Sequence, residues 1–184
     1  MGSEMCIRDR TGVNFNDFAG NQFITVTIPA STGGTQTGDS LTVFRGVALG
    51  GTLADSFASD DDRLSYNPGF VLNDTEAPVW LIFDATLPAT PTSLEIVTEA
   101  QAGTPGITAT LEAFNWTTST YDIVDTSPTS FNNDTVVTAD LTGGISDYVN
   151  GSNEVRSRIG WRQTGFIINF PWVASLDQLV WNFQ

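Results

Sequence analysis

The sequence predicts an all-β domain, a two-sheet antiparallel β-sandwich of jelly-roll type. Short runs of β-branched and aromatic residues recur at intervals typical of sandwiches, with turn residues between them. No segment of helical period is long enough to cross over between parallel strands, which favours antiparallel sheets. Two stacked sheets are the simplest way to bury so many short strands.

The last 32 residues, Asn153–Gln184, show the strand pattern most clearly. From Val155 to Trp161 apolar and small residues alternate with arginines, so the two sets fall on opposite sides of an extended chain. We therefore expect a strand with one dry face, carrying Trp161 in the core, and one charged face. Two apolar runs, Gly165–Phe170 and Leu176–Phe183, predict two more closing strands.

The first half of the chain contains three predicted strands. Gln22–Ile28 alternates and is rich in β-branched residues, Leu41–Leu49 is a longer apolar run, and Arg63–Tyr66 precedes a turn. Ala30–Ser40 is predicted to be a loop from its Gly, Ser and Thr content. Arg45 is in phase with apolar neighbours, so we expect a partly buried charge held by an acidic partner.

The central part of the chain contains further predicted strands separated by turn residues. Val79–Phe83 is apolar at every position, which predicts a central strand covered on both faces. An aromatic hairpin is expected where two strands flank a run of Thr and Ser. The remaining predicted elements are strands at Ser93–Thr98, Ile107–Trp116, Tyr121–Val124 and Asp134–Leu141, and one helical turn at Ile145–Val149.

Length and charge limit the partners. A chain of 184 residues suits one domain with a full core. It has 21 acidic residues against 7 arginines, no lysine, no histidine and a net charge of −14, which disfavours nucleic acid and anionic membrane as partners. No apolar run approaches the roughly 20 residues that span a bilayer, so we expect no membrane insertion.

Residues Met1–Arg10 resemble the translated read-through of a sequencing-library adapter. We expect this segment to be unstructured and residues 11–184 to form one sandwich domain, the C-terminal module of a longer protein. The segment contains Cys6, the single cysteine of the chain. The rest then has no disulfide, and its stability depends on the core.

Missing residue types exclude most catalytic chemistry. Without histidine, lysine or a native cysteine there is no Ser-His-Asp triad, no thiolate nucleophile and no Schiff base. A carboxylate pair of the glycosidase kind, about 5–10 Å apart, is the catalytic option that survives. No spacing singles out such a pair, so solvated surface charge is the favoured interpretation and no enzymatic activity is predicted.

No cofactor is predicted apart from an optional structural calcium. Three clusters could donate oxygen ligands: Asp60–Asp62, Asn73–Asp74 and Asn132–Asp134. None of them has the spacing of a known calcium loop. Each is better explained as a turn, because Asn and Asp favour left-handed backbone.

Aromatic and arginine residues near the predicted loops are candidates for stacking on a sugar ring and for donating to its hydroxyls or to a uronate. Trp172, which follows Pro171 between two strands, is the one expected to be most exposed. The alternative is that the arginines pair with carboxylates on neighbouring strands. The predicted ligand-binding residues are Trp116, Tyr121, Arg156, Arg158, Arg162 and Trp172.

The hairpin and the closing strands carry a further pattern, at Phe114–Trp116, Tyr121–Val124, Asp140–Thr142 with Tyr148–Val149, Val155–Ile159 and Asp177–Trp181. With these residues the C-terminal half resembles the galactose-binding-like jelly rolls, an architecture of many carbohydrate-binding modules and of accessory domains on large secreted bacterial proteins. The N-terminal half departs from this pattern. The resemblance implies a non-catalytic module, extracellular or at the cell surface, often sugar-binding and often holding a structural calcium.

Three functional hypotheses follow. The first is a binding module for a polysaccharide or another cell-surface component. The second is a structural spacer or assembly domain of a surface protein, for which a long exposed edge strand would be the sign. The third and least favoured is a carboxylate-dependent glycosidase, which requires a cleft with two facing carboxyls.

Overall fold

The computed structural model describes residues 33–73, 76–129, 131–165 and 170–184. The chain divides into two units, residues 1–31 and residues 32–184, and the second is described here by itself. The adapter-like segment and the predicted strand Gln22–Ile28 lie outside the described residues, as do residues 166–169 of the predicted strand Gly165–Phe170.

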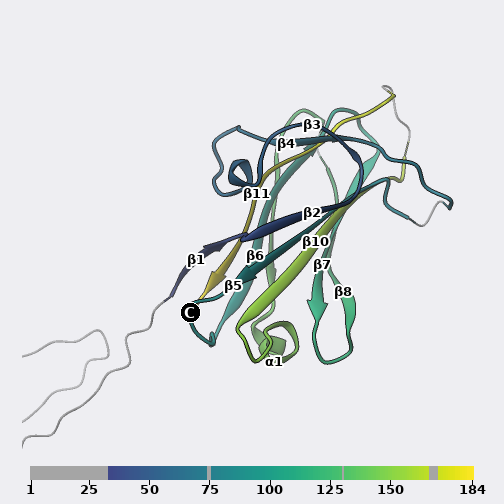
Figure 1. Cartoon of the computed structure of the whole chain (residues 1–184). Coiled ribbons are helices and arrows are strands. Elements are labelled where there is room, and N and C mark those ends of the chain that lie inside the picture. The colour runs from purple at the N-terminus through teal and green to yellow at the C-terminus, as the bar shows by residue number, and fades with distance from the viewer. Residues whose placement is uncertain (1–32, 74–75, 130, 166–169) are drawn as a thin grey trace, which may run out of the picture. The chain divides into compact units, whose positions relative to one another are not determined.

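The prediction of an all-β sandwich is confirmed (Figure 1). Three short helical segments accompany the strands: η1 Leu53–Ser56, η2 Thr142–Gly144 and α1 Ile145–Tyr148, the last at the predicted helical turn. The strands are β1 Gly34–Thr37, β2 Ser40–Arg45, β3 Val47–Gly50, β4 Leu64–Asn67, β5 Val79–Thr86, β6 Leu94–Ala102, β7 Ile107–Asn115, β8 Thr120–Pro128, β9 Thr135–Asp140, β10 Glu154–Gln163 and β11 Ala174–Phe183.

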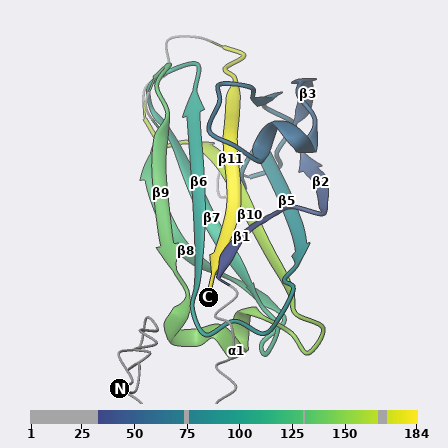
Figure 2. The same ribbon diagram turned by 90° about the vertical axis from the view of Figure 1, so that its left-hand side faces the viewer.

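The strands form two sheets, and every pair of these named strands is antiparallel. The six-stranded sheet has the order β3-β4-β11-β6-β9, with β1 also paired to β11, and the five-stranded sheet has the order β2-β5-β10-β7-β8. Figure 2 shows β9, β6 and β11 of the six-stranded sheet side by side. From β4 to β7 successive strands alternate between the sheets, as jelly-roll connections do.

The core lies between the sheets and is built by alternation. On β10, Ile159 and Trp161 are each 1% exposed and point inward, which confirms the core position predicted for Trp161. On β11 opposite, Leu179 and Trp181 are equally buried. The indole Nε1 of Trp181 donates to Oγ of Ser157 at 3.1 Å. This bond links the central strands of the two sheets and satisfies two buried polar groups.

Two expectations for the first described strands are wrong. The run Leu41–Leu49 is not one strand: Gly46, at φ 125°, divides it into β2 and β3, which belong to different sheets. The predicted loop Ala30–Ser40 contains β1, which pairs with the end of β11. Backbone pairing with β11 outweighs the low strand propensity of the sequence GTQT.

The expectation that β5 is covered on both faces is also wrong. Val79, Leu81 and Phe83 are fully buried, but Trp80 and Ile82 on the other side are half-buried. The apolar run reflects burial on one face and an aromatic surface on the other. Among the described residues no helix is long and apolar enough to cross a membrane.

Leu81→Ala tests the core. Leu81 is 0% exposed on a central strand, so truncation leaves a cavity and should lower the free energy of unfolding by about 2–5 kcal/mol. Urea denaturation measures the loss. Val136→Ala, at a side chain that is 61% exposed, is the control and should change stability by about 1 kcal/mol or less. Equal losses in the two variants would contradict the assigned core.

Candidate functional site

The outer face of the five-stranded sheet carries most of the chemistry predicted from the sequence. The alternation that turns Ile159 inward turns Arg156, Arg158 and Arg162 of β10 outward. Because β10 is the middle strand, with β5 on one side and β7 on the other, each arginine lies beside side chains of neighbouring strands.

Arg156 pairs with Asp84 of β5, its direct neighbour in the antiparallel register. Nε of Arg156 donates to Oδ1 of Asp84 at 2.5 Å. This hydrogen bond to Asp84 raises the pKa of Arg156, so the guanidinium stays charged. Its central carbon lies 5.5 Å from the ring centre of Phe114 and 5.7 Å from that of Trp116.

Arg158 is held more tightly. Its Nε and Nη2 donate to the two carboxylate oxygens of Glu112 on β7, at 2.6 and 2.7 Å. The same guanidinium lies 4.1 Å from the ring centre of Trp80 and 3.8 Å from that of Tyr121. Burial raises the pKa of Tyr121, while the two arginines act in the opposite direction.

Further ring contacts extend this arrangement across the sheet. Phe44 meets Trp80 edge-on at 5.5 Å between centroids, and Phe114 meets Trp116 and Tyr121 at 4.9 and 5.0 Å. The result is a connected row of side chains, which we call the aromatic–arginine ladder. Its members are Phe44, Trp80, Arg158, Tyr121, Phe114, Arg156 and Trp116.

Gly160 makes room for one member of the ladder. It is the cross-strand partner of Trp80. A Cβ atom at Gly160 would lie 2.9 Å from Cβ of Ala77 and 3.1 Å from Cδ1 of Trp80, closer than such atoms pack. A side chain here would therefore push the indole away from Arg158.

A pocket with about 170 Å³ of free space, open to solvent, lies at one end of the ladder. Trp116 and Arg156 line it, and Nε1 of Trp116 is buried without a hydrogen-bond partner among the described residues. Three carboxylates, of Asp39, Asp84 and Glu154, also line it, together with Ala85 and Thr86. The pocket thus combines one aromatic ring, one guanidinium and several acceptors.

The pocket carboxylates are held by neighbouring donors. Oδ2 of Asp39 accepts from the amide of Thr86 at 2.7 Å. Oε2 of Glu154 accepts from the side-chain amide of Asn150 at 2.6 Å. These hydrogen bonds orient the two carboxylates, which suits recognition of a ligand with several hydroxyl groups.

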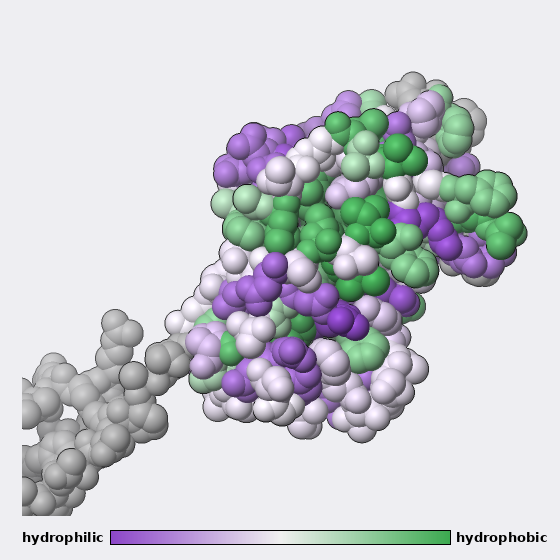
Figure 3. Space-filling view, viewed as in Figure 1, coloured by the Kyte–Doolittle hydropathy of each residue, from purple (hydrophilic) through white to green (hydrophobic). Residues whose placement is uncertain are grey.

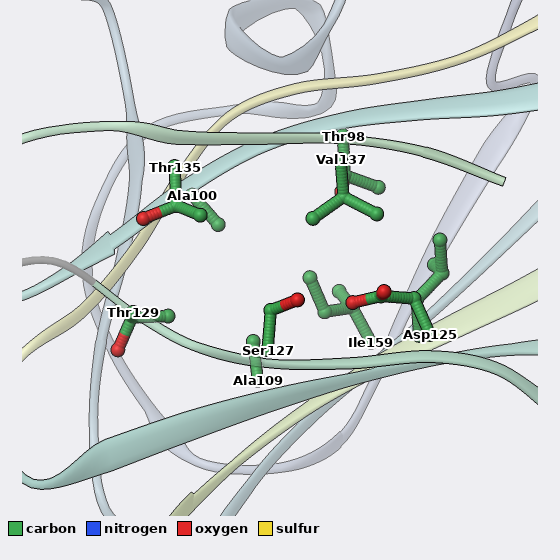
Figure 4. Close-up of a pocket in the computed structure, with 10 residues that line it drawn as sticks. Thr98, Ala100, Ala109, Asp125, Ser127, Thr129, Thr135, Val137 and Ile159 are labelled. Atoms are coloured by element: carbon green, nitrogen blue, oxygen red, sulfur yellow. The ribbon is translucent and has the colours of Figure 1, made fainter.

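A second, nearly filled hollow, with about 10 Å³ of free space, lies between the sheets where β8 faces β9 (Figure 4). Thr98 and Val137 from the six-stranded sheet face Ser127 and Asp125 from the five-stranded sheet. Its lining is made of small, hydroxyl and aliphatic side chains with one carboxylate, and it has neither an aromatic ring nor an arginine. The ladder and its pocket are the better candidate for ligand recognition.

Four of the six residues predicted to bind a ligand come together in the ladder: Trp116, Tyr121, Arg156 and Arg158. Their ligand-binding role stays a prediction. The alternative, that arginines pair with carboxylates on neighbouring strands, is confirmed for Arg156 and Arg158, and Arg45 pairs with Glu76 at 2.7 Å as expected. Arg162 lies on the same face of β10, opposite Thr108 and outside the ladder.

The expectation that Trp172 is exposed is wrong. Its side chain is 2% exposed and belongs to the hydrophobic core. It lies two residues before β11, where the chain enters the sandwich, and the indole packs inward instead of toward solvent. As placed, it offers no surface on which a ligand could stack.

Sequence reasoning missed Trp80, Phe44, Glu112 and Asp84. Trp80 belongs to the run Val79–Phe83, which is apolar at every position, so the sequence does not show which side chains face the core and which face outward. The two carboxylates become informative only through the pairing of β10 with β5 and β7. The available signal was that three arginines, Arg156, Arg158 and Arg162, share one face of β10, because a partly buried arginine needs an acidic neighbour.

The six-stranded sheet contains a cluster that could hold a metal ion. Glu99, Asp134 and Asp177 each offer one carboxylate oxygen, and these oxygens lie within 4.8 Å of one another. Burial raises the pKa of Asp177, and Glu99 and Asp134 act in the same direction against Arg63. Of the clusters predicted from sequence, Asn132–Asp134 contributes Asp134 to this set, and Asp74 lies outside the described residues.

Comparison with known proteins gives resemblance at the level of fold. No family model and no curated protein matches the chain. A xylan-binding module, CBM15, matches at TM-score 0.44 and 13% identity, over 79% of this chain and 97% of its own. A family 29 carbohydrate-binding module matches at TM-score 0.43 and 10% identity, over 78% of this chain and 88% of its own. A family 61 module, solved with β-1,4-galactotriose, matches at TM-score 0.34 and 9% identity, over 84% of this chain and 90% of its own.

Gly160→Ala tests the packing of the ladder. The added methyl group should displace Trp80 and lower the free energy of unfolding by about 1–3 kcal/mol through overpacking. Near-UV circular dichroism should change because the indole loses its contact with Arg158. Gly143→Ala, where a Cβ meets nothing within 4 Å, is the control. An unchanged aromatic spectrum in Gly160→Ala would contradict the contact.

Glu112→Gln tests the central ion pair. The variant leaves Arg158, 21% exposed, without its countercharge, and stability should fall by about 1–3 kcal/mol in urea denaturation. Glu95→Gln makes the same chemical change on the six-stranded sheet and should stay within about 0.5 kcal/mol of the parent. A loss no larger than that of the control would show that the pair is not stabilising.

Proposed function

We propose that this domain binds a neutral polysaccharide along the outer face of the five-stranded sheet. One observation carries the proposal: the aromatic–arginine ladder ends in a pocket that combines Trp116 with Arg156 and three carboxylates. The ladder would support an extended chain of sugar residues, and the pocket would receive one of them.

The chemistry of the pocket matches a pyranose ring. Such a ring has a face of C–H groups that packs on an aromatic side chain and a rim of hydroxyl groups that both donate and accept hydrogen bonds. Trp116 is half-buried in the pocket lining. Asp39 and Glu154 can accept from hydroxyl groups, and Arg156 can donate to them.

Charge favours a neutral ligand over an acidic one. Arg156 and Arg158 are each neutralised by a carboxylate of a neighbouring strand. The pocket lining has three carboxylates and one arginine, so a uronate would meet net negative charge. The chain as a whole, at −14, adds to this repulsion.

The proposal is for a non-catalytic module. A glycosidase would need one carboxyl kept as an acid in an apolar environment and a second one facing it. In the pocket Asp84 accepts from Arg156, Asp39 from a backbone amide and Glu154 from Asn150, an arrangement of oriented acceptors. We further propose, from the resemblance to accessory domains of secreted proteins, that the module works outside the cell or at its surface.

Affinity electrophoresis tests the function directly. Native gels containing neutral polysaccharides (xylan, galactan, mannan or β-glucan) are compared with gels containing polygalacturonate. We expect retardation by at least one neutral polymer and none by the acidic polymer. Trp116→Ala should weaken that binding at least about tenfold, because a central tryptophan dominates such contacts.

The matched control is Phe131→Ala, which removes a 41% exposed aromatic ring outside the ladder and should bind as the parent does. Thermal unfolding of every variant separates loss of binding from loss of fold. No retardation by any neutral polymer, or equal weakening in both variants, would overturn the proposal. Release of reducing sugar that Asp84→Asn abolishes would overturn its non-catalytic part and favour the glycosidase hypothesis.

A further inference from the structure

The pocket at the end of the ladder carries more negative than positive charge. The carboxylates of Asp39, Asp84 and Glu154 line it, together with one guanidinium, that of Arg156. Asp84 and Arg156 form an ion pair and neutralise each other. The carboxylates of Asp39 and Glu154 are left over, so the lining has two negative charges without a countercharge.

Strand pairing brings these two carboxylates to opposite sides of one residue. Thr86 ends β5, and Glu154 of β10 is its cross-strand partner. Asp39, in the turn before β2, accepts from the backbone amide of Thr86 at 2.7 Å. The pair of Asp84 and Arg156 is two residues further along the same strands and therefore on the same face. Figure 3 shows hydrophilic residues gathered over the lower part of the molecule, where β5 ends and β10 begins.

Neither of the two carboxylates meets a cation within the described part of the chain. Oδ2 of Asp39 accepts from an uncharged backbone amide, and Oε2 of Glu154 accepts from the uncharged side-chain amide of Asn150. The ion pairs between described residues all involve other carboxylates. Each carboxylate therefore keeps one oxygen, Oδ1 of Asp39 and Oε1 of Glu154, that can accept from a ligand.

The pocket suits an organic cation better than a metal ion. Among the described residues, the carboxylate oxygens that converge closely enough to hold a metal ion belong to the cluster of Glu99, Asp134 and Asp177, and none of them lines this pocket. One wall of the pocket is Trp116, whose ring attracts a positive charge and packs on C–H groups but cannot coordinate a metal ion.

We propose that the pocket binds an amino sugar with a free, protonated amino group, as one residue of a polysaccharide whose other residues lie along the ladder. The ammonium group donates to Asp39 and Glu154, and the C–H face of the ring packs on Trp116. The inference rests on the proposed function, because it names the class of sugar that the same pocket takes. It goes further, because a polymer that is neutral along the ladder becomes cationic at the pocket.

Electrostatics favour an ammonium group over a hydroxyl or an acetamide group at this position. Hydrogen bonds from an ammonium to a carboxylate are roughly twice as strong as those between neutral groups. The acetylated form of the same sugar has the same ring and hydroxyl groups but no charge, so it leaves both carboxylates without a countercharge. The net charge of −14 also raises the local concentration of a cationic ligand.

Calorimetric titration of the full chain with two soluble tetrasaccharides tests the inference. One is a β-1,4-linked tetramer of glucosamine, and the other is the same tetramer with every amino group acetylated. At about pH 5.5 the amino groups are protonated and ordinary carboxyl groups are ionised. We expect the glucosamine tetramer to bind about tenfold more tightly than the acetylated one, and added sodium chloride to weaken only the glucosamine tetramer.

Glu154→Gln removes one of the two charges and keeps an oxygen that can accept from Asn150. It should weaken binding of the glucosamine tetramer about threefold to tenfold, and that of the acetylated tetramer by less. Adding Asp39→Asn should bring the ratio of the two affinities close to one. Glu95→Gln makes the same chemical change on the six-stranded sheet and should bind both tetramers as the parent does. Thermal unfolding of each variant identifies loss of fold.

The inference is overturned if the parent binds the two tetramers equally or binds neither. Equal losses of affinity in Glu154→Gln and Glu95→Gln would also overturn it, because they would show general attraction of a cation to an acidic surface. Retardation by neutral polymers in the electrophoresis gels tests the proposed function separately. Where that retardation is present and depends on Trp116, these outcomes remove the amino sugar and leave the glycan site in place.

Discussion

The bidentate pair between Arg158 and Glu112 is the interaction on which the outer face of the five-stranded sheet depends. A cation on the middle strand of a sheet has neighbours on both sides and cannot turn away to solvent as one on an edge strand can. Its charge must be neutralised within the sheet, and Glu112 does so with two hydrogen bonds. The aromatic rings of Trp80 and Tyr121 also contact the guanidinium, so one ion pair is in contact with residues from β5, β7 and β8.

The same alternation that creates this face also creates the core. Strand β10 turns Ile159 and Trp161 inward and its arginines outward, and a shift of one residue would exchange the two sets. The buried bond between Trp181 and Ser157 fixes the middle strands of the two sheets against each other. The closing segments of the chain therefore determine both the packing between the sheets and the positions of the ladder residues.

How much of this arrangement the sequence predicts depends on the range of the interaction. The alternation of β10 is local, so its two faces, the core position of Trp161 and the need of its arginines for acidic partners could be predicted. The identity of those partners could not, because Asp84 and Glu112 are separated from them by 72 and 46 residues. Burial of Trp172 and the break at Gly46 also depend on where the chain enters a sheet.

The acidic cluster of Glu99, Asp134 and Asp177 also could not be predicted from the sequence, because its residues are far apart along the chain. The sequence pointed to runs of neighbouring Asp and Asn, but the structure brings together Glu99, Asp134 and Asp177 from three separate strands or strand ends. No local spacing marks them, and the bulge that directs Asp177 toward Glu99 is a property of strand pairing. Within that set, only Asp134 belonged to a run that the sequence had singled out.

The net charge of −14 limits which ligands the surface attracts. Four arginines of the described chain form ion pairs, at Glu76, Asp134, Asp84 and Glu112, so excess carboxylates dominate the electrostatic potential of the surface. That potential repels anionic polymers and attracts divalent cations, and both effects weaken as salt shortens the Debye length. Stacking of a neutral sugar on an aromatic ring has no such dependence. Salt should therefore leave the affinity for a neutral glycan nearly unchanged.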